Sequence, residues 1–286
     1  MTTNPTLAAG AAPGLYPGLS FANYWVLPAV NHSRLEPFKK TAAHAREEML
    51  HPKDSTEALA TGHAFHVFVL EPERFRREYV VPPKVDRRTK EGKAIWAAFE
   101  EEHPTQLAIS QDEYGQFEAM RAAILSHPVA AELLQSAIAR ELSFVWQEES
   151  EGRAPILCKG RADLLSPYGG WVWIVDLKTT RDAGERSFSK DVASYGYHRG
   201  MGWYRRGLNI LKPADPRRVA FIAVEKEPPY AVAVHELDER ALEQGEREML
   251  RYLDAYQSCL SSGVWPGYDP GMSLMDLPPW AVDRLD

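Results

Sequence analysis

The sequence has little cysteine: Cys158 and Cys259 are the two such residues among 286. Two cysteines do not make the disulfide framework of a secreted protein. They are also too few for a four-thiolate zinc site or a four-cysteine iron–sulfur cluster. We therefore expect a reducing compartment and a cytoplasmic location.

Several segments and motifs are also missing. No run of about 20 apolar residues occurs, so the sequence predicts no membrane-spanning helix. Residues 1–33 contain no Lys, Arg, Asp or Glu and therefore lack the basic start of a signal peptide. The absence of GxxxxGK[ST], HExxH and GxSxG excludes phosphate-loop ATPases and the most easily recognised metalloproteases and esterases.

The composition is typical of a folded globular protein, with 44% hydrophobic residues and a net charge of −7 from 33 Lys+Arg and 40 Asp+Glu. Taken alone, this charge argues against a nucleic-acid partner. Two stretches are locally basic, residues 74–93 and residues 199–218. We expect phosphate contacts from the second stretch, whereas the first fits a solvated helix and loop equally well.

Apolar periodicity and turn residues predict helices first and strands later. We expect helices over residues 33–50, 55–71, 89–102, 111–126, 188–208 and 239–261, and strands over residues 143–147, 156–165, 171–178, 218–225 and 231–236. The expected N-caps of the first, second and fourth helices are Ser33, Ser55 and Ser110. Residues 1–18 are expected to be a flexible arm and residues 19–286 a single domain. The fold class is α/β or α+β with a helical N-terminal front.

The most informative segment is a strand that ends in charged residues. Residues 171–175 are apolar, yet Asp176 and Lys178 follow on one face, since side chains alternate along a strand. A turn over residues 167–170 predicts a hairpin that brings Asp163 near Asp176. Neighbouring carboxylates favour a divalent cation, and a nearby ammonium stabilises an oxyanion, as phosphodiester hydrolysis requires. The competing interpretation is a surface Asp–Lys pair at a sheet edge.

These residues carry a family resemblance. A G-x-x-D pattern ending at Asp163, a turn and the D-x-K-T-T run of residues 176–180 resemble the core of PD-(D/E)XK nucleases in their RecB-like branch. A closer resemblance, to the RecE-like nuclease domains of exodeoxyribonuclease VIII, covers residues 19–280. Its further motifs are residues 61–66, 69–75, 86–89, 195–198 and 277–281. The resemblance implies a restriction-endonuclease-like fold, a central mixed β-sheet flanked by helices.

The resemblance also implies a role for each matched residue. Asp163 and Asp176 would bind Mg²⁺ or Mn²⁺, together with the Leu177 backbone carbonyl and His66 from the helical front. Lys178 would be the catalytic lysine, and Glu141 a further acid of the catalytic site. The residues implied in DNA contact are Arg161, Thr179, Tyr195, Tyr197, His198, Arg87 and Arg88. His63 and His66 are three residues apart on an expected helix, but no third nitrogen or sulfur ligand for zinc lies nearby in the sequence, which argues against a zinc site. Without the resemblance, His66 would be interpreted as a core histidine.

The sequence departs from the family pattern at Gly200, where RecB-like nucleases usually carry Gln. This departure bears on how a DNA end is positioned more than on the metal site. It also keeps open the alternative of a nuclease-like domain that binds DNA or a partner without cutting.

The resemblance implies a metal-dependent, ATP-independent exonuclease that degrades one strand of linear double-stranded DNA from its 5′ end and leaves a 3′ single strand. It further implies a ring-shaped homo-oligomer, a tetramer, and a single-strand annealing protein as partner in phage-type recombination. An endonuclease of the same superfamily is the other alternative. A four-cysteine Cas4-like nuclease is excluded, since the chain has two cysteines.

Overall fold

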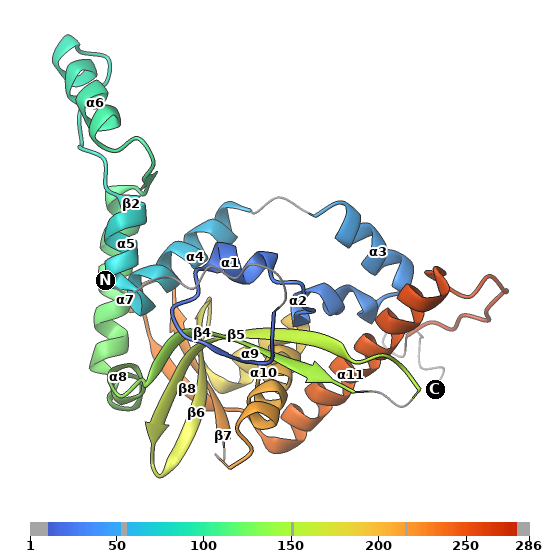
Figure 1. Ribbon diagram of the computed structural model, residues 1–286. Coiled ribbons are helices and arrows are strands. Elements are labelled where there is room, and N and C mark those ends of the chain that lie inside the picture. The colour runs from blue at the N-terminus through green and yellow to red at the C-terminus, as the bar shows by residue number, and fades with distance from the viewer. Residues whose placement is uncertain (1–10, 53–55, 150–151, 215–216, 279–286) are drawn as a thin grey trace, which may run out of the picture.

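A mixed six-stranded sheet forms the centre of the computed structural model, which describes residues 11–52, 56–149, 152–214 and 217–278 (Figure 1). In spatial order the strands are β1 (Gly14–Tyr16), β4 (Ala139–Glu148), β5 (Ile156–Tyr168), β6 (Trp171–Thr180), β7 (Arg217–Glu225) and β8 (Val232–Glu236). β6 and β7 run parallel, whereas the other neighbouring strands run antiparallel. Two short parallel strands, β2 (Tyr79–Val80) and β3 (Leu107–Ala108), form a separate pair.

Helices cover both faces of the sheet. One buried cluster joins it to α2 (His32–Leu35), η1 (Glu36–Lys39), α3 (Ala42–Leu50), α9 (Glu185–Tyr195), α10 (Tyr197–Leu211) and α11 (Glu239–Ser262). A second cluster joins the opposite face to α4 (Glu57–Leu70), α5 (Pro72–Glu78), α7 (Gln111–Ser126) and α8 (Pro128–Gln135). The short helix α1 (Phe21–Val26) packs on β4, and α6 (Lys90–Glu102) projects away from the body (Figure 1). The central mixed sheet flanked by helices confirms the predicted fold class.

β6 is buried on both faces, as its apolar sequence predicts. Ile174 belongs to the cluster on the α10 side, and Val175 and Leu177 belong to the cluster on the α4 side. Asp176 lies in this strand with 5% of its surface exposed. Burial of a carboxylate costs several kcal/mol unless it is paired or bound to a metal, so this position requires a chemical explanation.

Helix α10 is held against the sheet by an unusually close crossing with α11. A Cβ atom on Gly202 would lie 2.7 Å from the backbone nitrogen of Glu246, and one on Gly245 would lie 2.3 Å from the carbonyl oxygen of His198. Real side chains do not fit at such distances, so only glycine permits this approach of the two backbones. The crossing fixes α10, the helix that passes over the end of β6.

The predicted elements differ from the structure mainly where helices are interrupted. The helix expected over residues 33–50 is instead α2, η1 and α3, with Asn31 and Thr41 as N-caps rather than Ser33. Ser55 lies outside the described residues, and Thr56 caps α4. The Ser110 cap is confirmed, with a capping box formed with Glu113.

Prolines and a glycine explain the other differences. Pro72 and Pro128 lie just after the expected ends of two helices, and each begins the next helix, α5 and α8, because proline suits the first turn of a helix. The helix expected over residues 188–208 is divided at Gly196, whose φ of +75° is in the left-handed region.

The N-terminal segment differs from the expected flexible arm. Residues 1–10 lie outside the described residues, but Gly14–Tyr16 forms β1 and pairs antiparallel with β4. The described part of the segment is therefore held by backbone hydrogen bonds. Among the described helices, none has the length and hydrophobicity that a membrane span requires.

Candidate active site

Three carboxylates lie side by side across three neighbouring strands. The β4–β5 register pairs the residues on either side of Glu141 with those on either side of Asp163, so these two acids face each other. The antiparallel β5–β6 register pairs Leu164 with Val175. One position further along, the same register sets Asp163 opposite Asp176. Within these described strands neither acid pair belongs to the ladder of paired residues.

The sheet forks at this point. The backbone N–H of Leu177 donates a 2.9 Å hydrogen bond to Asp163 Oδ2 instead of to a backbone carbonyl of β5. From Asp176 to Thr180, β6 pairs with β7. The fork leaves Lys178 and the carboxylates at an open end of the sheet, because β5 no longer covers that edge of β6.

Glu141 has an unusual backbone conformation at the fork. Its φ is +48°, in the left-handed region that non-glycine residues rarely adopt. Such a conformation costs of order 1–2 kcal/mol and persists where surrounding structure holds it. Arg161 provides part of this hold, since its Nε donates a 2.6 Å hydrogen bond to Glu141 Oε2.

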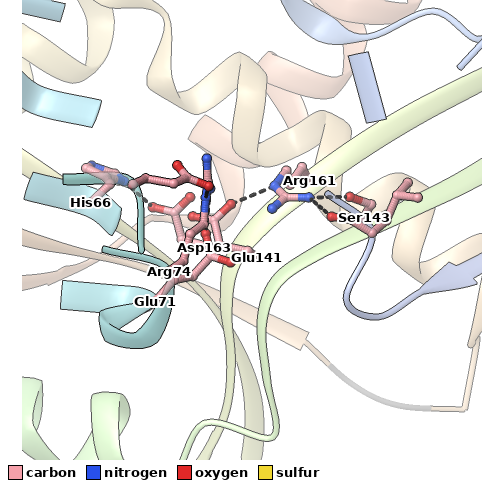
Figure 2. A network of polar contacts seen from close by, with 9 residues as sticks. His66, Glu71, Arg74, Glu141, Ser143, Arg161 and Asp163 are labelled. Atoms are coloured by element: carbon pink, nitrogen blue, oxygen red, sulfur yellow. Dashed lines mark hydrogen bonds and ion pairs between the residues drawn. The ribbon is translucent and has the colours of Figure 1, made fainter. Parts of the chain in front are cut away.

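His66 reaches the acids from α4. Its Nδ1 lies 3.4 Å from Asp163 Oδ2, and the close-up shows it beside Asp163 and Glu141 (Figure 2). One potential ligand atom from each of His66, Glu141 and Asp163 lies within 4.8 Å of the others. This grouping contains Glu141 in place of the expected Asp176.

Asp176 pairs instead with the lysine two residues further along β6. Lys178 Nζ lies 2.5 Å from Asp176 Oδ2 and 4.9 Å from the ring centre of Tyr197. Lys178 therefore supplies the charge partner that a buried carboxylate requires.

The electrostatics of the acids follow from burial and mutual repulsion. Burial and the charge of Asp176 raise the pKa of Asp163 to about 7. Burial and the charge of Asp163 raise the pKa of Glu141 to about 7. Burial alone would lower the pKa of Lys178, but Asp176 and Asp163 outweigh it and the net pKa is raised, so the ammonium stays charged.

These residues fit a divalent cation. The grouping of His66, Glu141 and Asp163, and the raised pKa values of its two acids, are the signs of a site that lacks positive charge. Carboxylate oxygens are the ligands that Mg²⁺ and Mn²⁺ prefer, and one imidazole is compatible with Mn²⁺. The Leu177 contact with Asp163 is through its amide, and a role for its carbonyl stays a prediction.

Arg161 has a different environment from the expected DNA contact. It is 8% exposed, and its Nη1 donates hydrogen bonds to the Leu19 carbonyl and to Ser143 Oγ, in addition to the Nε bond to Glu141. These contacts turn the guanidinium into the protein, so a direct DNA contact does not fit. Its place beside Glu141 is shown in Figure 2.

A second charged pair near the acids was missed in the sequence. Arg74 Nη1 donates a 2.8 Å hydrogen bond to Glu71, at the end of α4, and its Nε donates one to Glu78. Glu71 lies close enough to contribute to the raised pKa of Glu141 (Figure 2). The signal was present as an i, i+3 Glu–Arg pair, but such pairs are common on exposed helices.

The aromatic residues expected to face DNA lie beside Lys178. Tyr195 is 65% exposed, and its ring stacks on that of Tyr197 with centres 5.6 Å apart. Thr179, next to Lys178 on β6, lines a hollow that α4 and α7 also border. His198 Nδ1 instead lies 3.2 Å from the Val192 carbonyl oxygen of α9.

Gly200 lies opposite a histidine. A Cβ atom at this position of α10 would be 3.6 Å from the ring of His32, and that ring meets Tyr204 edge-on. His32 Nδ1 is buried and has no hydrogen-bond partner in the described chain. The space beside Gly200 is therefore bordered by an imidazole from α2.

Much of the expected basic surface is neutralised by ion pairs. Four arginines of this run form ion pairs with acids of η1, β4, β8 and α11; they are Arg199, Arg205, Arg206 and Arg218. The basic run of residues 199–218 is therefore largely structural. Arg88 pairs with Asp86, and Arg87 lies 4.0 Å from the Trp96 ring. Both arginines precede α6, which projects from the body (Figure 1).

Comparisons with known proteins agree with this geometry. The family model of a PDDEXK-like domain of unknown function (DUF3799) matches residues 31–273. The structure of a candidate exonuclease from Eubacterium rectale aligns with a TM-score of 0.54 and 14% identity, over 91% of this chain and 95% of that chain. A second structure, SSO0001, aligns with a TM-score of 0.26 and 15% identity, over 54% of this chain and 69% of that chain.

The two structural alignments differ in weight. At 14% identity the first supports the fold alone, and the second is too weak to support an argument. No curated protein matches the sequence. The family match spans most of the chain, including the three carboxylates and Lys178. The chain therefore belongs to the PDDEXK-like family of the PD-(D/E)XK nuclease superfamily.

Proposed function

We propose that the protein is a metal-dependent, ATP-independent exodeoxyribonuclease that hydrolyses phosphodiester bonds of linear double-stranded DNA. The observation that carries this proposal is the alignment of Glu141, Asp163 and Asp176 across three strands, with Lys178 at the open end of β6. A sheet-edge ion pair would not need two further acids, each with little exposed surface, at facing positions of the neighbouring strands.

Each residue of the site has a chemical task in this proposal. Asp163, Asp176, Glu141 and His66 hold the cation, Mg²⁺ or Mn²⁺, with the Leu177 carbonyl as a further ligand. The cation supplies Lewis acidity toward a phosphate and lowers the pKa of water. Lys178 places a fixed positive charge where negative charge develops on the phosphate, an effect worth roughly 10²–10³ in rate in comparable sites.

DNA is held around the open end of β6. Tyr195 and Tyr197 present a stacked aromatic surface beside Lys178, and Thr179 offers a hydroxyl on the same strand. Arg181 follows β6 directly and is exposed, and Lys190 of α9 is exposed as well. These cations replace the basic run of residues 199–218 as the nearest phosphate contacts.

The finer features of the proposal are supported by the resemblance to RecE-like domains. These features are digestion that starts at 5′ ends and leaves 3′ single strands, assembly into a ring-shaped tetramer, and recombination with an annealing protein as partner. The structural neighbour from Eubacterium rectale, named as an exonuclease candidate, supports the exonuclease class. A cytoplasmic location fits the buried free thiols Cys158 and Cys259.

The test is digestion of linear duplex DNA with magnesium by the wild-type chain and by Asp163→Ala, Asp176→Ala and Lys178→Ala. We expect digestion by the wild type, none by the variants, and none by the wild type in EDTA. Unchanged digestion by all three folded variants would exclude the mechanism. Retention of linear DNA by the wild type without magnesium-dependent loss would instead favour a binding domain that does not cleave.

A further inference from the structure

Two buried cations on β5 anchor α1 beside the active site. Side chains alternate along the strand, so Lys159, Arg161 and Asp163 emerge from it in series. Lys159 Nζ donates hydrogen bonds of 2.9 Å to three carbonyl oxygens at the end of α1. Arg161 binds the carbonyl of Leu19 just before the helix and also Glu141. The helix is thus fastened at both ends to the strand that carries Asp163.

The anchoring explains how so short a helix keeps a fixed position. α1 has six residues, too few to be stable alone. Lys159 is 4% exposed, and it lies at the negative end of the helix dipole. Asp163 lies four positions after Lys159 along the strand, about 13 Å at the usual rise per residue. The end of α1 is therefore a short distance from the carboxylates.

Large apolar side chains of α1 remain in solvent. Trp25 is 60% and Val26 75% exposed, and the rings of Trp25 and Phe21 stack with centres 6.1 Å apart. A rigid helix that presents a stacked, exposed indole has the form of a platform for a planar ligand. Nucleobases stack on such rings irrespective of sequence.

A hollow of about 410 Å³ lies beside this platform, between α1, α2 and α3. Trp25 and Val26 form its apolar side, and Asn31, Ser33 and Arg34 form its polar side. Glu48 also lines it and has a further partner of its own. Arg34 is exposed and forms no ion pair with any described residue. The exposed Lys39 and Lys40 lie at the end of η1 and directly after it. Arg34 therefore adds a positive charge without a described ion-pair partner to the lining of the hollow.

His32 relates the hollow to the active site. It lies between Asn31 and Ser33, which line the hollow, and its ring borders Gly200 on α10 and packs edge-on against Tyr204. Charge interactions reach from Lys178 and Asp176 to this imidazole. The hollow therefore lies in the neighbourhood of the active site, with the His32 ring packed between α2 and α10.

We propose that this hollow binds an unpaired nucleotide of single-stranded DNA next to the active site, with its base on Trp25 and a phosphate on Arg34. The proposal rests on the nuclease function proposed above and adds a binding place for one separated strand. An aromatic platform with a basic rim is the usual arrangement of single-strand sites. A hydrophobic partner chain would not require the unpaired cations.

The test is binding of a fluorescein-labelled oligodeoxythymidylate to the full chain in EDTA, followed by fluorescence anisotropy. Trp25→Ala should weaken binding about 5- to 150-fold, as expected for loss of one stacked base, and Trp25→Phe should retain most of the affinity. Trp171→Ala is the matched control, since it removes an indole from the other end of β6, and it should bind like the wild type. Arg34→Ala should reduce the slope of log affinity against log salt by about 0.7, the value for one single-strand phosphate.

Equal affinities for Trp25→Ala and Trp171→Ala would overturn the proposal, as would a wild-type chain that does not bind the oligonucleotide. A Trp25→Ala variant with an altered sedimentation mass but unchanged affinity would overturn it too, by marking the hollow as a protein interface. Circular dichroism verifies that each variant is folded. Because EDTA prevents cleavage, the binding result is independent of whether the chain digests duplex DNA with magnesium.

Discussion

Glu141 and Asp163 face each other across β4 and β5 where the ladder between the strands is interrupted, and Glu141 has a φ of +48° at that point. The strand backbone is distorted where the two acids meet. Strain of this kind is maintained at sites where geometry serves chemistry. We interpret the distortion as the feature that turns the Glu141 carboxylate toward Asp163 and His66.

Glu141→Gln should weaken Mn²⁺ binding at least about tenfold, because it removes one negative charge from the ligand group. Isothermal titration calorimetry measures the affinity directly. Glu118→Gln, an exposed change on α7, is the matched control and should bind Mn²⁺ like the wild type. An unchanged Mn²⁺ affinity in Glu141→Gln would show that Glu141 is not a ligand of the metal.

Asp163 gives a pH dependence of stability in the metal-free chain. Its pKa is about 7 in the folded state and near 3.8 in the unfolded state. Between these values the folded state holds a proton that the unfolded state has released, so the contribution to stability is present below pH 4 and is lost as pH rises to about 7. The difference approaches about 1.4 kcal/mol per pH unit.

Asp163→Asn should therefore become more stable relative to the wild type as pH rises from about 4 to 7. Urea unfolding in EDTA at several pH values measures the difference between the two chains. In this difference the opposite contribution of His32, whose pKa is lowered by burial, cancels. A constant difference across this range would show that Asp163 is ionised in the metal-free chain.

Lys178→Met should reduce the rate of digestion about 100-fold or more, because it removes the fixed charge that stabilises the phosphate. Binding of duplex DNA in EDTA should change little, since one cation among several contributes modestly to non-specific affinity. Arg240→Met, an exposed change on α11, controls for loss of a positive charge. A proportional loss of binding and of rate would assign Lys178 to DNA binding alone.

Gly202→Ala and Gly245→Ala should each destabilise the chain by about 1–3 kcal/mol, because a methyl group forces the α10 and α11 backbones apart. Gly62→Ala is the control: it lies within α4 with nothing within 4 Å of the added atom, so helix propensity predicts a gain of up to about 1 kcal/mol. Chemical unfolding compares the three variants. Equal stabilities would mean that the crossing adapts without cost.

The central strand and its acids were predictable because their pattern is local. A continuous apolar run marks β6, the Gly169–Gly170 turn sets the hairpin, and these two features place Asp163 beside Asp176. Glu141 and His66 came from the family resemblance, because their proximity depends on the β4–β5 register and on the packing of α4. Neither is visible in the spacing of the residues.

The basic run of residues 199–218 could not be interpreted from the sequence for a related reason. Arg199 pairs with Glu36 and Glu248, and Arg206 with Glu148 and Glu246. A basic run in the sequence says nothing of acids that lie about 40 or more positions away and pack against it in three dimensions.

The helix expected over residues 33–50 failed because Asn31 and Thr41 caps outweighed continuous apolar periodicity.

The most direct test of the central claim is magnesium-dependent digestion of linear duplex DNA labelled at its 5′ or its 3′ ends, beside a covalently closed circle. The account predicts early release of the 5′ label as small products, late loss of the 3′ label and an intact circle. An Asp112→Asn variant, changed at an exposed acid of α7, should behave like the wild type, and Asp176→Asn should release neither label. Nicking of the closed circle by the wild type, or no release of either label with magnesium, would contradict the account.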